Sequence, residues 1–455
     1  MKSLAAFLRQ SGDLYRFGSG LIWSMVGTVA VRLTPLITTV LISRGFGIEV
    51  VGQFAVAYGT LVSAGMLAAT GVSLMAIRNI AAEAEQAPEF AGRIAGLALM
   101  LAAGCGLLLS ALFYFLADVI AARLLRQPEI APYLALIAPI ILLNAMGQVQ
   151  ISILSGLQKF RSIARLNVIY GFVLILSVPA GLYLGGLTGC FLAMAGAAVC
   201  LCAIAYPAMR SALAEHGITI TFAGALSEWP LITNFAVPAL LASIVFEPVN
   251  WICTAIIVST PDGLKEVGVY YIAMQVETLL LFVPQIVVQV IVPMFSKGFG
   301  ARDRGRVLSV LAMSVGTNFV IALGFVGAML LFGNWVLAIF KLDAAHWPVF
   351  AIAVANAAIM SVALPLGPIP AASGYTWTGL VITAGWATTF ILGTWLMRDQ
   401  GAEGAMTARM IAWASQSVIY VFFTRYAVRK VCDNHAIAMA GQPAGRRGAA
   451  GLEQG

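Results

Sequence analysis

The sequence predicts an all-α polytopic membrane bundle of 12 transmembrane helices arranged in two six-helix lobes. Three observations lead to this fold class: the composition, the length of the apolar runs and an internal repeat. Of the 455 residues, 61% are hydrophobic and only 10% are charged, whereas soluble domains carry roughly 25% charged residues. This composition excludes a soluble enzyme, a nucleic-acid-binding domain and a disordered chain.

Twelve apolar runs are long enough to cross a bilayer as helices, because roughly 20 residues cover about 30 Å of hydrocarbon. They are continuous rather than alternating, so helices and not barrel strands are expected to satisfy the backbone. The first run is expected to remain in the chain, because it exceeds a signal-peptide core and contains Arg32. The runs lie at about 18–42, 51–76, 94–120, 132–155, 166–184, 189–208, 230–258, 267–295, 308–332, 348–371, 378–397 and 405–427.

The distribution of Lys and Arg predicts that both termini are cytoplasmic. With the N-terminus inside, 18 of the 26 basic residues fall in inner segments and six fall in outer ones. The net charge of +7 follows from this topology, so it requires no nucleic-acid partner.

Two short matches indicate an internal repeat of six spans. Val51-Gly52 matches Val267-Gly268 at an offset of 216, and Ser155-Gly156 matches Ser373-Gly374 at an offset of 218. Parallel repeats of this kind are typical of transporters whose two halves rock around a central site. The predicted domains are an N-terminal lobe, a cytoplasmic linker, a C-terminal lobe and a cytoplasmic tail expected to be disordered, at 1–207, 208–229, 230–427 and 428–455.

Charged residues inside the spans are the main functional candidates. A charge at the bilayer centre costs roughly 2.5–3.5 kcal/mol on insertion scales, so such residues usually face an interior cavity. The guanidinium of Arg32 could bind a phosphate or pyrophosphate, or it could form a structural ion pair with Glu247 or Glu277. Arg409, near the start of the last span, is expected to snorkel outward. The alternative is that its guanidinium donates hydrogen bonds to the substrate.

Two acids near the middle of the bilayer are candidates for ion coupling. Glu247 is followed by Pro248 and, one turn on, by Asn250, while Glu277 lies in the eighth span. A buried carboxylate could exchange H⁺ near neutral pH, or it could bind Na⁺ together with the Asn250 amide. The choice of H⁺ or Na⁺ stays open, and so does a purely structural role for both acids.

Polar stripes on two spans predict the lining of a cavity. Residues three or four apart share a helix face, and two such faces consist of Asn144, Gln148, Ser152 and Ser155, and of Arg409, Trp413, Gln416 and Tyr420. Each stripe alone could serve hydrogen bonding between helices. Because both halves carry one, a polar cavity that receives sugar hydroxyls is the better interpretation. The predicted substrate-binding residues are Arg32, Asn144, Gln148, Arg409 and Gln416.

Three motifs resemble the polysaccharide transporter branch of the multidrug/oligosaccharidyl-lipid/polysaccharide (MOP) exporter superfamily. They are Ser43-Arg44-Gly45-Phe46-Gly47, Val51-Gly52-Gln53-Phe54, and the fourth-span exit Ser155-Gly156-Leu157-Gln158-Lys159-Phe160-Arg161. That branch contains the Wzx-type flippases for lipid-linked oligosaccharides. The likeness extends over nearly the whole chain, and the twelve predicted spans argue against the lipid II flippases, which usually have fourteen.

The resemblance implies a flippase that moves a polyprenyl-pyrophosphate-linked oligosaccharide across the bacterial inner membrane for surface polysaccharide biosynthesis. The expected partners are this lipid, other membrane lipids and other polysaccharide assembly proteins. No cofactor is expected beyond a coupling H⁺ or Na⁺, since the six cysteines show no metal-ligand spacing. A cation-coupled multidrug antiporter (MATE type) is the alternative, although Arg32 would repel cationic cargo. A membrane-embedded glycosyltransferase or polymerase fits less well, because the longest outer loop, about 333–347, offers only Lys341, Asp343 and His346.

Overall fold

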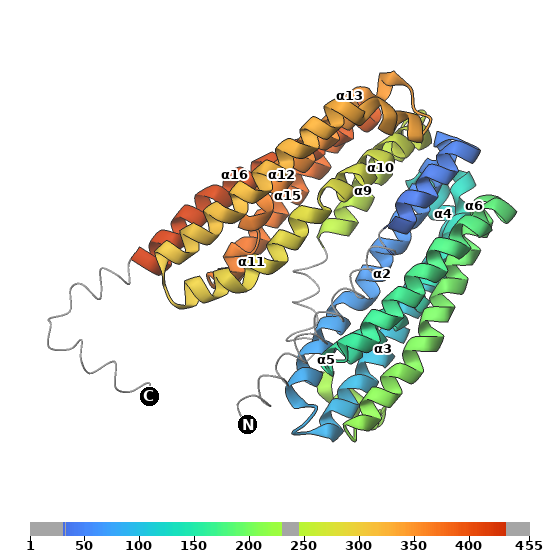
Figure 1. Ribbon diagram of the computed structural model, residues 1–455. Coiled ribbons are helices and arrows are strands. Elements are labelled where there is room, and N and C mark those ends of the chain that lie inside the picture. The colour runs from blue at the N-terminus through green and yellow to red at the C-terminus, as the bar shows by residue number, and fades with distance from the viewer. Residues whose placement is uncertain (1–30, 32, 230–244, 434–455) are drawn as a thin grey trace, which may run out of the picture. The chain divides into compact units, whose positions relative to one another are not determined.

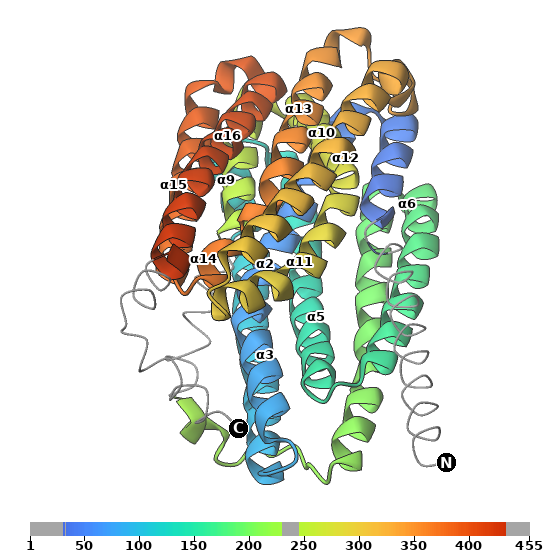
Figure 2. The same cartoon turned by 60° about the vertical axis from the view of Figure 1, so that its left-hand side comes forward.

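A computed structural model describes residues 31, 33–229 and 245–433 (Figures 1 and 2). Within these ranges the chain is helical and contains no strand, as the sequence predicts. Arg32, most of the first predicted span and part of the seventh lie outside the described residues. Packing divides the chain into two compact units, unit 1 (Met1–Ile272) and unit 2 (Ala273–Gly455). The lobe boundaries placed at 208–229 stay a prediction.

Seven described helices are long and apolar enough to cross a membrane, or eight when one bent pair counts as a single span. The chain is therefore an all-helical, polytopic membrane bundle. The total of twelve spans stays a prediction, because some of the predicted spans fall partly outside the described ranges.

Unit 1 is a bundle in which α2, α3, α5 and α6 run side by side (Figure 1). Its core consists mainly of small and branched apolar side chains from these helices, such as Ala95, Ile94 and Ile153. The elements are a helix at Leu33–Phe46, α2 Ile48–Glu83, α3 Pro88–Phe115, α4 Ala117–Val119, η1 Ile120–Leu124, η2 Pro128–Ile130, α5 Ala131–Gly156, α6 Phe160–Glu215, η3 Ala225–Glu228, α9 Phe246–Val258 and α10 Gly263–Leu280, whose last residues belong to unit 2.

The long helix α6 is a hairpin of the two predicted spans 166–184 and 189–208. Its backbone leaves the helical conformation at Gly185 and Gly186, and Gly186 has φ of 59°, a conformation that glycine adopts without steric cost. Beyond this turn the two arms touch at Gly181 and Gly189, where a Cβ on either residue would meet the carbonyl oxygen of the other. Glycine at these positions thus permits both the reversal and the close packing.

The segment after α6 folds back onto α3. The Thr221 amide donates to the Gly92 carbonyl at 3.2 Å, and Arg93 pairs with Glu228 at 3.1 Å. Gly92 and Gly96 leave no space for a Cβ, because backbone carbonyls of the returning segment lie directly against them. The predicted linker is therefore fastened to unit 1 rather than extended, and its first residues continue α6 as helix.

A reciprocal contact within unit 1 joins α2 to α10. A Cβ added to Gly52 would meet the Leu264 carbonyl oxygen, and one added to Gly268 would meet the Ile48 carbonyl oxygen. Ile48 and Leu264, like Gly52 and Gly268, are 216 residues apart, which is the repeat offset in the sequence. Such an exchange of equivalent contacts is what a two-fold relation between repeats produces.

Unit 2 packs α12 against α11 and α13, and α16 against α13 and α15, and Figure 2 shows these helices running alongside one another. The Asp303 side chain caps α12 by accepting from the Arg306 amide. The further elements are α11 Phe282–Gly300, α12 Arg304–Ile339, η5 Ala344–His346, α13 Trp347–Ala363, η6 Leu364–Leu366, α14 Ile369–Ala372, α15 Thr376–Leu396, η7 Arg398–Gln400, α16 Gly401–Val428 and η8 Arg429–Asp433.

The eighth predicted span is broken. Helices α10 and α11 meet at an angle of 45° on either side of Leu281. Pro284 lies just after the break and has no amide to continue the hydrogen-bond ladder, a common cause of such kinks. Glu277 lies one turn before the bend, and its carbonyl accepts from the Leu281 amide.

Candidate functional site

Unit 1 contains a cavity of about 490 Å³ between the helix Leu33–Phe46, α2, α5 and α6. One wall comes from Thr34, Pro35 and Thr38, which share a face of the first helix. The polar side chains that line the cavity are Thr34, Thr38, Tyr58, Thr70, Ser73, Asn144, Gln148, Ser152 and Tyr170. The cavity therefore offers hydroxyl and amide groups on an otherwise apolar surface.

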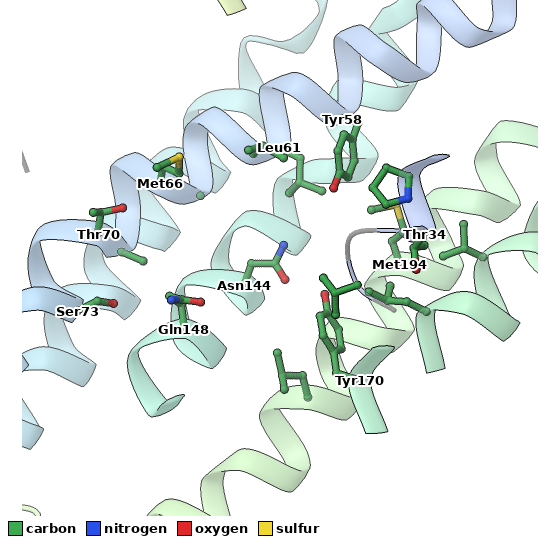
Figure 3. Close-up of a pocket in the computed structure, with 18 of the residues that line it drawn as sticks. Thr34, Tyr58, Leu61, Met66, Thr70, Ser73, Asn144, Gln148, Tyr170 and Met194 are labelled. Carbon is green, nitrogen blue, oxygen red and sulfur yellow. The ribbon is translucent and has the colours of Figure 1, made fainter. Parts of the chain in front are cut away.

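The predicted stripe on α5 supplies the centre of this lining. Asn144 and Gln148 point from α5 into the space bounded by α2 and α6 (Figure 3). Gln148 is exposed to the cavity and Asn144 is half-buried. The Ser152 hydroxyl donates to the Gln148 backbone carbonyl at 2.8 Å, which leaves its oxygen free to accept. Ser155 is not among the residues that line the cavity.

Several lining residues are absent from the sequence-based prediction. Tyr58 stacks on Phe54 with ring centroids 5.3 Å apart, and its hydroxyl end faces the cavity together with Tyr170 (Figure 3). Thr34 and Thr38 stand four residues apart, so the spacing rule that identified Asn144 and Gln148 could have found them. The tyrosines carried no comparable signal, because aromatic residues are common throughout the spans.

The described part of the cavity lining is uncharged. It contains no Asp, Glu, Lys or Arg. Arg32 lies outside the described residues, although its neighbours Val31 and Thr34 both line the cavity. The expected binding of phosphate by Arg32 stays a prediction.

Glu247 and Asn250 lie near the start of α9, which packs against α2. The Ser63 hydroxyl donates to the Glu247 backbone carbonyl at 3.1 Å, and the Trp251 indole donates to the Thr60 hydroxyl at 2.8 Å. Both Glu247 and Asn250 are half-buried. They belong to unit 1, whereas Glu277 belongs to unit 2, so the predicted ion-coupling residues are divided between the units.

Unit 2 holds a buried ion pair between Glu277 of α10 and Arg409 of α16. Arg409 Nη2 lies 2.9 Å from Glu277 Oε1, and Arg409 Nε donates to the same carboxylate at 3.2 and 3.3 Å. Asn356 Nδ2 of α13 donates to Glu277 Oε2 at 2.9 Å. The residues Glu277 and Arg409 are only 1% and 8% exposed.

The expectation that Arg409 snorkels outward is wrong. Arg409 lies about two turns inside α16, and a buried carboxylate lies within reach of its guanidinium, so the side chain turns inward to compensate that charge. Glu277 was one of the two acids proposed as an ion-pair partner of Arg32, and its partner in the structure is Arg409. Asn356 was missed by sequence reasoning, although an amide within the apolar run 348–371 was a usable signal.

The predicted polar face of the last span turns into the interior of unit 2. The Arg409 guanidinium lies over the Phe390 ring at 5.7 Å, and Trp413 contacts Trp386 with ring centroids 5.3 Å apart. Gln416 is 2% exposed, and its Oε1 has no hydrogen-bond partner among the described residues. Arg409 and Gln416 do not line the unit 1 cavity, so their predicted contact with substrate stays a prediction.

The fold defines the class of protein. The chain superimposes on an inward-facing multidrug resistance MATE family transporter of the MOP superfamily with a TM-score of 0.75 at 13% identity, over 90% of this chain and 98% of that one. It superimposes on the lipid II flippase MurJ, in its inward closed conformation, with a TM-score of 0.71 at 14% identity, over 93% of each chain. The molecule therefore has the fold of MOP-superfamily transporters.

The family follows from the sequence match. Residues 17–299 match the family described as "Polysaccharide biosynthesis protein". The chain belongs to this family, which confirms the resemblance to the polysaccharide branch of the superfamily. It is also 23% identical over 421 residues to the EPS I polysaccharide export inner membrane protein EpsE of Ralstonia solanacearum, covering 90% of this chain and 93% of that protein. The corresponding protein of Ralstonia nicotianae is 22% identical over 417 residues, with the same coverage.

Proposed function

We propose that the chain is a flippase that moves a polyprenyl-pyrophosphate-linked oligosaccharide from the cytoplasmic to the periplasmic leaflet by alternating access. Membership of the polysaccharide biosynthesis family supports the glycan cargo. The similarity to EpsE, named as a polysaccharide export inner membrane protein, supports a location in the bacterial inner membrane. The same comparison agrees with a role in building surface polysaccharide.

The cavity of unit 1, which has hydroxyl and amide groups and no charge along its described lining, is the observation that carries this proposal. A glycan that crosses hydrocarbon must exchange its hydration shell for other hydrogen-bond partners, since an unpaired polar group in an apolar medium costs several kcal/mol. The nine polar side chains of the lining can donate and accept such bonds. The cavity volume of about 490 Å³ lies within the range of small-molecule sites.

The multidrug antiporter alternative fits this cavity less well. A site for organic cations favours carboxylates and aromatic rings, and the described lining contains no carboxylate. In unit 2, the charge of Glu277 is already compensated by Arg409, so Glu277 could carry a coupling ion only if Arg409 released it. Coupling to H⁺ or Na⁺ through Glu247, Asn250 and Glu277 remains part of the proposal to be tested.

The pyrophosphate of the cargo needs a cationic partner near the glycan site. Arg32 is adjacent in sequence to cavity-lining residues, and a guanidinium matches phosphate oxygens in a bidentate geometry. We assign the anionic head to Arg32 and the sugars to Asn144 and Gln148.

Complementation of a deletion strain tests the proposal. The double variant Asn144→Leu/Gln148→Leu should reduce surface polysaccharide about tenfold, because each lost hydrogen bond is worth about 0.5–1.5 kcal/mol, and lipid-linked precursor should accumulate inside. Arg32→Ala should have at least as large an effect. Ser155→Ala, on the same face of α5 but outside the cavity lining, is the matched control. Normal polysaccharide in the double variant, with increased sensitivity to cationic dyes, would instead support drug export.

A further inference from the structure

A long apolar groove runs along one face of unit 2. It has a volume of about 1010 Å³ and lies between α12, α13 and α16. The side chains from α12 recur at helical spacing and present one continuous apolar face, namely Leu308, Leu311, Val315, Phe319, Leu323 and Val326. Several of them are well exposed, Leu323 to 56%. The groove is therefore shaped for a hydrocarbon chain rather than for a polar solute.

One end of the groove is strongly basic. Arg304 begins α12, and Arg425 and Arg429 lie at the end of α16 and just beyond it; all three line the groove. No acidic residue is among the described residues of the lining. Arg425 and Arg429 also border a neighbouring hollow that includes Lys430. This end of the groove is complementary to an anionic head group, and guanidinium groups bind phosphate with directed, charge-assisted hydrogen bonds.

The length of the groove selects among anionic lipids. The lining on α12 extends from Arg304 to Val326, about 33 Å at a rise of 1.5 Å per residue, whereas the lining on α16 and just beyond it extends from Ser417 to Arg429, about 18 Å. The whole hydrocarbon core is about 30 Å thick, so an acyl chain anchored at the basic end would occupy only about the half that belongs to its own leaflet. A long isoprenoid chain could continue along the α12 lining beyond the part that α16 also lines.

We propose that this groove binds a polyprenyl phosphate or pyrophosphate, with the phosphate against Arg304, Arg425 and Arg429 and the isoprenoid chain along α12. The basic end coincides with the predicted cytoplasmic side, where a glycan carrier would be loaded. The identity of the lipid rests on the proposed flippase function, whereas the groove and its charge do not. In this bound state the phosphate lies on unit 2, and it reaches Arg32 only after the lipid has left the groove for transport.

The basic end and the apolar portion of the groove contribute differently to lipid binding. Lipid tails are as apolar as the groove, so little hydrophobic free energy is gained when a chain moves from bilayer to groove. The affinity therefore comes mainly from the arginines, because each basic side chain near the membrane surface attracts anionic lipid. The apolar portion supplies selectivity for chain length through packing.

Photocrosslinking on the full chain in nanodiscs tests the inference. The probe is a long-chain polyprenyl monophosphate with a diazirine at the end of the chain far from the phosphate. We expect labelled peptides from α12 and α13 near Leu323. Leu323→Trp, which fills the groove, should reduce labelling about fivefold, as expected for a packing effect of this kind. Val320→Trp is the control, because Val320 lies on the same helix, is 68% exposed and does not line the groove.

Head-group variants and competitors complete the test. Arg425→Gln/Arg429→Gln should weaken probe binding about tenfold, whereas Arg306→Gln, outside the groove, should not. Displacement of the probe by equal amounts of phosphatidylglycerol would overturn the inference in favour of an ordinary anionic lipid, and displacement by inorganic phosphate alone would overturn the role of the chain. Stronger labelling of a chain that ends at residue 433 would mean that the protein's own C-terminal residues cover the groove, which would also overturn it.

Failure of this inference is distinguishable from failure of the proposed function. Labelling requires no transport, and complementation requires no labelling. Loss of the expected labelling pattern, together with reduced surface polysaccharide in Asn144→Leu/Gln148→Leu, would remove the groove but keep the flippase. Groove labelling by the probe in a chain whose cavity variants export polysaccharide normally would keep the lipid site and remove the flippase.

Discussion

The interiors of the two units use polar residues in opposite ways. In unit 1, hydroxyl and amide side chains surround a cavity of about 490 Å³ and leave it uncharged along its described lining. In unit 2, a carboxylate and a guanidinium are buried against each other, with Asn356 on the carboxylate and aromatic rings around the guanidinium. The polar groups of the unit 1 cavity can still form hydrogen bonds with a ligand, whereas the charged groups of the unit 2 pair bond to each other.

This difference indicates a division of labour between the two units. Neutral polar groups can exchange water for sugar hydroxyls at little cost, so they suit a site that must bind and release. A buried ion pair is costly to separate, because each charge would be left uncompensated. Unit 2 is therefore expected to be the more rigid of the two around its polar centre.

The largest expected effect is on the buried pair in unit 2. Arg409→Met leaves the Glu277 carboxylate buried with Asn356 as its remaining side-chain hydrogen-bond partner among the described residues, and the loss of one partner of a buried pair typically costs about 3–5 kcal/mol. We expect a correspondingly lower thermal unfolding temperature for the purified protein in detergent.

The double variant Glu277→Leu/Arg409→Met is the control for this prediction. Because no charge is left unpaired, it should be more stable than Arg409→Met and close to the wild type. If the two variants were equally destabilised, the pair would not be the source of the effect. If Arg409→Met kept its stability but lost polysaccharide export, the pair would serve transport rather than structure.

A smaller effect is expected at the glycine crossing of unit 1. In Gly52→Ala the new Cβ would press on the Leu264 carbonyl, and in Gly268→Ala on the Ile48 carbonyl; backbone atoms cannot rotate away, so overpacking should cost about 1–3 kcal/mol. The two variants should be destabilised by similar amounts in thermal unfolding. Gly59→Ala is the matched control on α2, since nothing lies within 4 Å of its added Cβ, and it should be neutral or slightly stabilising. Unequal costs at Gly52 and Gly268 would argue against a two-fold contact.

The smallest effect concerns an exposed ion pair in unit 1, which contrasts with the buried pair of unit 2. Lys159 Nζ lies 2.6 Å from Glu215 Oε2, and this hydrogen bond lowers the pKa of Glu215 below its ordinary value. At pH values above the ordinary carboxyl pKa, the pair therefore contributes its full stabilisation of the fold. This contribution is lost as the pH falls through the lowered pKa of Glu215.

Thermal unfolding of Lys159→Gln across pH checks this prediction. The difference in Tm from the wild type should be small at neutral pH, should shrink below about pH 4 as the carboxyl protonates, and should also shrink in about 1 M salt. A difference that persisted under both conditions would have to come from packing rather than charge.

Sequence reasoning reached the helical membrane class because composition and run length depend on the bilayer, not on tertiary contacts. The ranges predicted for spans two to six and nine to twelve correspond closely to described helices, including the two arms of α6. Of the predicted stripe on α5, Asn144, Gln148 and Ser152 line one cavity and Ser155 does not. Residues of one helix keep their relative directions wherever the helix packs. Spacing on a single helix was thus enough to find one wall of the cavity.

Helical spacing could not predict which side chains on different helices contact each other. Arg409 was expected at the membrane interface, and only packing reveals Glu277 beside it, 132 residues earlier in the chain. The same holds for Asn356 on the carboxylate, for Tyr58 and Tyr170 in the cavity, and for the break between α10 and α11. Each depends on which helix faces which.

The sequence by itself determined that this protein crosses the membrane many times as helices, that it contains an internal repeat, and that it resembles polysaccharide transporters. These properties follow from local hydrophobicity, charge placement and short motifs. The tertiary structure alone decided which polar residues surround a cavity and which neutralise each other. The reason is physical: a buried charge or amide acquires its role from the groups within hydrogen-bonding distance, and in a bundle those groups come from other helices.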